Sequence, residues 1–176
     1  MSKHILAKFF NKYNDLQTDT IALFAACFNI PIYEREIWNI VQTGDLEKFK
    51  LMDKSNADIA KLLQIAVFND HIEIVKYMMN LWDINPDAFY AQRFKNNVCI
   101  IHTHYYTLSW IASFAGSIDT LKYLSDIKAD IKKQWEDEMD IESPLFIAKY
   151  NNQTEIIKLL ESHIEKIFET NIYMNY

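Results

Sequence analysis

The chain has 176 residues and a net charge of −6, its sequence pI is about 5.3, and half of its residues are hydrophobic. This length and apolar fraction predict a single domain with a core of useful size. The negative charge argues against a duplex-DNA binder, because such proteins need a positive face to neutralise phosphates. We therefore expect no nucleic acid among the partners.

The cysteines and the apolar segments indicate the cellular compartment in which the protein works. The two cysteines lack the spacing of a disulfide framework, and the amino terminus lacks the order of a cleavable signal peptide. The longest apolar run, Ile21–Ile32, is too short to cross a bilayer. These features predict a cytoplasmic protein with no membrane partner.

Residues 1–33 are expected to form an amino-terminal helical cap. Residues 3–11 have the pattern of a short amphipathic helix, and residues 16–29 that of an apolar helix that Pro31 ends. The two helices lack the repeated pattern that follows, and the terminal units of stacked repeats are atypical. A separate docking element is the alternative.

From residue 34 to residue 163 one pattern occurs four times. Each copy reads as the end of one helix, a tight turn and the start of a second helix, and the turns are centred on Gly44, Asp70, Gly116 and Asn152. The mean period is 36 residues, and apolar residues recur at i, i+3 and i+4 in the second helices. This periodicity predicts stacked helix pairs. Close approach of the paired helices should bury Ala66, Ala112 and Ala148.

The pattern resembles the ankyrin repeat. The family motif T-P-L-H-x-A is closest at Ser143–Ala148, and its second-helix motif x-E-I-V-K-x-L-L is matched by Ile72–Met79 and Thr154–Leu160. The resemblance implies an all-α solenoid of about four helix-turn-helix repeats with helical caps and irregular fingers. It also implies a non-enzymatic module that binds a protein partner through its concave face.

The step from the anchor of the second copy to the anchor of the third is about 13 residues longer than the 33-residue repeat of the family. The extra residues form an insert between these two copies. Residues 86–95 could add a helical turn with Pro86 at its first position, and Val98–Ile101 reads as a short strand or buried segment. Long loops on repeat proteins often carry binding residues. The alternative is that the aromatic residues of this insert only pack against neighbouring helices.

Cys99, His102 and His104 lie close together in this insert and carry the second functional hypothesis. Three such side chains are the ligands of a small metalloprotein or the parts of a cysteine enzyme. A structural zinc site requires a second ligand pair, which the sequence lacks, and His71 in a repeat turn is expected to bond the backbone. We expect no catalytic residues, no bound metal and no cofactor.

Two further segments lie towards the carboxyl end. The acidic run of residues 136–142 is expected to be a solvated finger tip, with a contact for a basic partner as the alternative. Residues 164–176 are expected to extend the last helix to about Thr170 and to end in a tail, because the apolar residues up to Phe168 keep helical spacing.

Three aromatic residues stand two positions before their turn anchors, and the ankyrin resemblance implies that they form a ladder on the concave side. They are Phe68, Phe114 and Tyr150. Aromatic side chains are enriched at interface hot spots, so we expect partner binding there, flanked by Trp110, Phe89 and Phe94. The alternative is that the rings only fill gaps between helices.

The composition of the chain suggests one hypothesis about its source. The sequence is rich in Ile, Asn, Lys, Tyr and Phe, which hints at an AT-rich genome. With the ankyrin resemblance, this composition suggests a monomeric, host-directed factor of an intracellular bacterium or a large DNA virus, acting inside the host cell.

Overall fold

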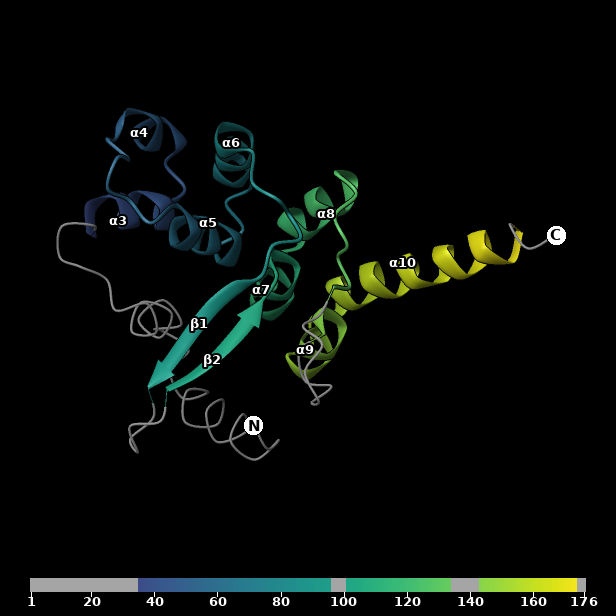
Figure 1. Cartoon of the computed structure of the whole chain (residues 1–176). Helices are drawn as coiled ribbons and strands as arrows, with labels where there is room; N and C mark the ends of the chain where they lie inside the picture. The colour runs from purple at the N-terminus through teal and green to yellow at the C-terminus, as the bar shows by residue number, and fades with distance from the viewer. Residues whose placement is uncertain (1–34, 96–100, 134–142, 174–176) are drawn as a thin grey trace.

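The computed structural model describes residues 35–95, 101–133 and 143–173 (Figure 1). These residues form eight helices and one two-stranded hairpin. The helices are α3 (Arg35–Thr43), α4 (Leu46–Leu51), α5 (Ile59–Phe68), α6 (Ile72–Trp82), α7 (Leu108–Ala115), α8 (Ile118–Asp126), α9 (Pro144–Tyr150) and α10 (Thr154–Tyr173). The strands are β1 (Tyr90–Lys95) and β2 (Ile101–Tyr106).

The helices form four pairs, and the pairs stand side by side. The first helices α3, α5, α7 and α9 contact one another in that order, and so do the second helices α4, α6, α8 and α10, of which α4, α6 and α8 stand above the first helices in Figure 1. The hairpin leaves the connection between α6 and α7 and extends on the side of the first helices. Apart from this hairpin the described elements are helical, as the sequence predicted.

The tight turns lie at the four predicted anchors. Gly44, Asp70, Gly116 and Asn152 all have positive φ, at 76°, 56°, 86° and 57°. Glycine adopts this left-handed conformation without cost, and Asp and Asn tolerate it better than other residues. In each turn the next backbone N–H donates to a carbonyl five residues earlier, at N···O distances of 3.2, 2.9, 2.9 and 2.9 Å. The same Schellman-type closure therefore ends all four first helices.

The first helices also begin in related ways. Three of them start after a side chain whose oxygen accepts a backbone N–H three residues later, namely Asp58, Thr107 and Ser143. This bond satisfies one of the donors that the first turn of a helix leaves without an intrahelical partner. Pro144 follows Ser143 at a position where no N–H is needed.

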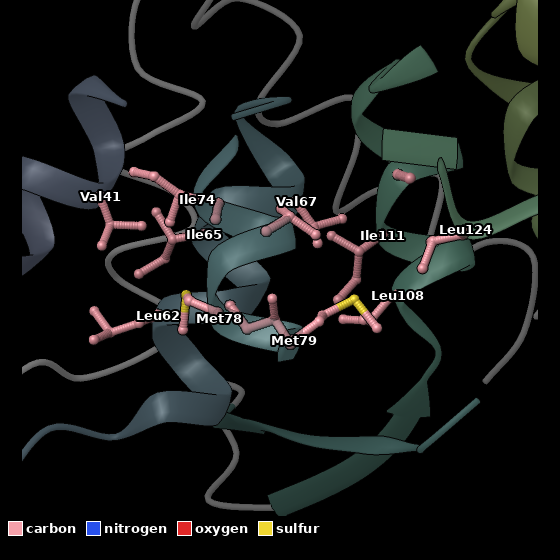
Figure 2. Packing of buried hydrophobic residues seen from close by; sticks show 14 of the residues in the cluster. Val41, Leu62, Ile65, Val67, Ile74, Met78, Met79, Leu108, Ile111 and Leu124 are labelled. Atoms are coloured by element: carbon pink, nitrogen blue, oxygen red, sulfur yellow. The ribbon is translucent and has the colours of Figure 1, made fainter. Parts of the chain in front are cut away.

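The core lies between the two rows of helices. Figure 2 shows Val41 from α3, Leu62 and Ile65 from α5, and Ile111 from α7 in one continuous layer with side chains of α6 and α8. The predicted alanines Ala66, Ala112 and Ala148 are fully buried. An alanine with no room for a larger side chain is what close helix packing requires.

Hydrogen bonds between neighbouring pairs fix the stacking at the turns. His71 Nε2 donates to the carbonyl oxygen of Gln42 at 2.7 Å, Ser117 Oγ donates to that of Phe68 at 3.2 Å, and Asn151 Nδ2 to that of Phe114 at 2.9 Å. The three acceptors hold the same position in successive first helices. His71 bonds the backbone, as expected. These bonds place the ends of the first helices in one line.

The insert differs from the expected helical turn at residues 86–95. The backbone N–H of Ala88 donates to the carbonyl of Asn85, and Asn85 Oδ1 accepts the N–H of Asp87. Pro86 therefore stands second in a β-turn, where its fixed φ is as suitable as at the start of a helix. Strand β1 follows and pairs antiparallel with β2, from Tyr90 opposite Tyr106 to Lys95 opposite Ile101. Of the expected strand at 98–101, only Ile101 lies among the described residues.

An ion pair links the two helices of the last pair. Lys149 of α9 and Glu161 of α10 form an ion pair with an Nζ–Oε1 distance of 2.7 Å. Helix α10 runs on to Tyr173, three residues past the expected end. The expected cap of residues 1–33 and the acidic finger lie outside the described residues. In the part of the chain that the structure describes, no helix is long and apolar enough to cross a bilayer.

Candidate functional site

The predicted ladder residues all lie where the first helices end. Phe68 is the last residue of α5, Phe114 the last but one of α7, and Tyr150 the last of α9. The backbone carbonyls of Phe68 and Phe114 each accept a hydrogen bond from a side chain in the turn of the next helix pair. These bonds fix the backbone that carries the two rings. The fold thus brings equivalent positions of successive pairs to one side.

Ring contacts join these residues into two groups, one on α5, α7 and the hairpin and one on α9. The ring centroids of Phe68 and Phe114 lie 6.2 Å apart, and those of Phe114 and Trp110 lie 5.4 Å apart with nearly parallel planes. Trp110 stacks in turn on Tyr106, at 4.1 Å, and Phe146 stacks on Tyr150, at 6.4 Å. We call this surface the aromatic face; it comprises Phe68, Tyr106, Trp110, Phe114, Phe146 and Tyr150.

Two members of the aromatic face, Phe146 and Tyr106, were missed by the sequence analysis. Phe146 stands four residues before Tyr150, as Trp110 stands four residues before Phe114. Residues at i and i+4 share one side of a helix, so this spacing could have identified Phe146. No local signal identifies Tyr106, because the hairpin register that brings it next to Trp110 is a long-range feature.

The aromatic face is open to solvent to different degrees. Tyr150 is 44% exposed, whereas Phe68, Trp110, Phe114 and Phe146 are half-buried. The neighbouring Lys149 is engaged by Glu161, so the charge beside Tyr150 is balanced within the chain.

The indole N–H of Trp110 is buried and has no hydrogen-bond acceptor in the described part of the chain. A buried donor without an acceptor costs free energy of folding. Natural sequences break such local rules mostly at functional or strained sites. The indole of Trp110 lies at the centre of the ring contacts, between Tyr106 and Phe114 in the chain of stacked rings.

The other two predicted flanking residues, Phe89 and Phe94, belong to the insert between α6 and α7. Phe89 is half-buried just before β1, with Lys133 Nζ 4.9 Å from its ring centroid. Asp87 joins the same region, since its carboxylate accepts the N–H of Asp130 and its carbonyl accepts Lys133 Nζ. Phe94 lies in β1 opposite His102, where the structure describes the backbone only. Phe89 is thus part of the contact between two fingers.

The Cys99–His104 group is described only in part. Cys99 lies outside the described residues, and His102 and His104 belong to β2, where only the backbone is described. Elsewhere in the described residues, no three side chains of His, Cys, Asp or Glu lie close enough to hold a metal ion. The metalloprotein or cysteine-enzyme hypothesis therefore stays untested.

One titratable group near the aromatic face has a shifted pKa. Burial raises the pKa of the Tyr90 phenol to about 12, because the ionised form loses its hydration. Tyr90 is the first residue of β1 and pairs with Tyr106, which stacks on Trp110. The buried phenol thus anchors the hairpin beside the aromatic face.

No model of a known protein family matches the sequence, and no characterised protein is significantly similar to it.

Proposed function

We propose that this chain is a divergent ankyrin-like module that binds a protein partner through the aromatic face and has no enzymatic activity of its own. The observation that carries the proposal is the continuous set of ring contacts from Phe68 through Phe114 and Trp110 to Tyr106. Rigid aromatic side chains bury a large area on binding at low cost in conformational entropy.

The arrangement of the helices supports the ankyrin-like part of the proposal. Four helix pairs stand in two rows, the same left-handed turn closes each first helix, and a hairpin extends on the side of the first helices (Figure 1). Stacked pairs of this kind present an extended surface rather than a catalytic pocket. The proposal of a host protein as the partner depends only on the resemblance and the composition.

The chemistry of the aromatic face favours an apolar partner segment over a strongly basic one. Trp110 has Tyr106 against one side and stacks with Phe114 at an interplanar angle of 6°. A cation–π contact requires a free ring face, whereas a stacked ring presents its edge. Ring edges pack well against aliphatic side chains and against other ring faces.

Tyr150 offers the sharpest single test, because it is the most exposed member of the aromatic face. A partner is first captured by the wild-type chain from cell lysate, then purified, and its affinity measured. Tyr150→Ala should weaken binding at least about tenfold, equivalent to about 1.4 kcal/mol, with no change in melting temperature. The matched control is Tyr123→Ala on α8, a half-buried tyrosine of the other row. Equal affinities of the two variants would exclude this face as the binding surface.

A further inference from the structure

Strand β2 contains two histidines that are separated by one residue. His102 stands opposite Phe94 in the hairpin register, and His104 stands opposite Gln92. In a strand, residues i and i+2 lie on the same face of the sheet, whereas in a helix they do not face each other. The spacing alone permits either arrangement. The pairing of β1 with β2 decides between them, and it places both histidines on one face of the hairpin.

The histidine face of the hairpin contains no lysine or arginine of the two strands. Residues directly opposite each other share a face, and the two cationic residues of the strands, Arg93 and Lys95, belong to the other face. A metal ion on the histidine face therefore lies on the side of the sheet away from these positive charges. The histidine face comprises Tyr90, Gln92, Phe94, His102, His104 and Tyr106.

The base of the hairpin is held firmly against the helices. Tyr90 is 9% exposed, and Tyr106 stacks on Trp110 of α7 with ring centroids 4.1 Å apart. From this base the hairpin extends away from α7 as an antiparallel ladder, and the ladder fixes the backbone that carries both histidines (Figure 1). Two ligands on a fixed backbone lose less conformational entropy on binding than two ligands on a loop.

We propose that His102 and His104 bind one divalent metal ion of the Zn²⁺ class through their imidazole nitrogens. Residues i and i+2 are about 6.7 Å apart along a strand, so two rings on one face can reach a common ion at Zn–N distances of about 2.0–2.1 Å. Imidazole suits Zn²⁺ and Cu²⁺, whereas Mg²⁺ and Ca²⁺ prefer oxygen ligands. Water, or a group from another molecule, completes the coordination sphere.

This two-histidine site departs from both expectations that the sequence offered. The chain as a whole was expected to bind no metal, and the alternative was a group of three ligands that includes Cys99. The site requires no thiol and depends on the strand geometry of β2. It is also independent of the aromatic face, so failure of the metal site leaves the proposed function standing.

The test is a calorimetric titration of the metal-free full chain with Zn²⁺, accompanied by NMR spectra of the imidazole nitrogens. The signals of His102 and His104 should shift together on addition of Zn²⁺, and that of His163 should not. Loss of a residue that merely orients a metal ligand costs about 10- to 100-fold in affinity, so His104→Ala should weaken binding at least about tenfold. The matched control is His163→Ala, which removes a half-buried histidine of α10 and should leave the affinity unchanged.

A variant of unchanged composition tests the strand geometry. Thr103→His combined with His104→Thr keeps two histidines in β2 but moves one of them to the opposite face, so the affinity should fall as far as in His104→Ala. Cys99→Ser should bind Zn²⁺ as tightly as the wild type. Wild-type affinity in the exchanged variant, loss of binding in Cys99→Ser, or no binding by the wild type overturns the proposal. The NMR spectra use the unaltered chain, so they decide the question even if a variant fails to fold.

Discussion

Gly44 meets two requirements at one position. Its φ of 76° lies in the left-handed region, and a Cβ atom there would lie 2.6 Å from Nδ1 of His71. The same imidazole donates from Nε2 to the carbonyl of Gln42. The missing side chain of Gly44 therefore allows both the turn and the hydrogen bond that links the first two pairs.

Gly44→Ala should lower the free energy of unfolding by about 2 kcal/mol, from the left-handed conformation and the contact with the His71 ring together. In a His71→Ala background the contact is absent, and the loss should fall to about 1 kcal/mol. Urea unfolding of the four proteins in this double-mutant cycle measures both values. Strictly additive losses would show that the ring is not the obstacle.

A substitution of Thr120 is expected to stabilise the fold, whereas Gly44→Ala is expected to destabilise it. Its hydroxyl is fully buried and has no hydrogen-bond partner within the described residues, whereas its backbone N–H is bound by Asp70. Thr120→Val replaces the hydroxyl with a methyl group and should stabilise the fold by about 1 kcal/mol.

The matched control for Thr120 is Ser117→Ala, which removes the bond from Ser117 Oγ to the carbonyl of Phe68 and should cost about 1 kcal/mol. Thermal unfolding compares the two variants with the wild type. A destabilised Thr120→Val protein would mean that the hydroxyl has a partner.

At the scale of elements, the hairpin should respond to alkaline pH through Tyr90. The pKa of this phenol is about 12 in the fold, against about 10 in an unfolded chain. Above about pH 10 the phenol ionises in the unfolded chain but stays protonated in the fold, so the free energy of unfolding falls as the pH rises from about 10 towards about 12. Below about pH 10 the free energy of unfolding does not depend on this phenol.

Tyr90→Phe removes this titration and keeps the buried ring. Between about pH 9 and about pH 11, the wild type should lose about 1 kcal/mol more stability than the Tyr90→Phe variant. Urea unfolding at both pH values measures the difference. Parallel losses in the two proteins would contradict the burial of the phenol.

The elements were predictable where local chemistry determines them. The tight turns at the four anchors and the buried Ala112 are properties of a few adjacent residues, and both were inferred correctly. The segment 86–95 was not, because proline favours a β-turn and a helix start equally. Only the pairing of Tyr90 with Tyr106, sixteen residues apart, distinguishes the two.

At the scale of the whole molecule, the candidate site too was predictable where sequence spacing determines it, and not where long-range pairing does. Spacing along the chain was enough to bring Phe68, Trp110 and Phe114 together, since the repeat period sets equivalent positions side by side. It could not place Tyr106, whose neighbour depends on the hairpin, and it did not reveal the contact of Phe89 with Lys133. The expected monomeric state stays a prediction.

The central claim is that the aromatic face binds a partner and is not simply core. The first pair carries Gln42 at the ladder position, so the protein itself shows which residue the fold accepts there. The most direct measurement is the partner affinity of Phe68→Gln, Phe114→Gln, Tyr150→Gln, together with its melting temperature and circular dichroism. We predict that affinity falls by more than about 100-fold, equivalent to about 2.7 kcal/mol, while the helical spectrum is retained and melting falls by only a few degrees. A variant that unfolds, or one that binds as tightly as the wild type, would contradict the claim.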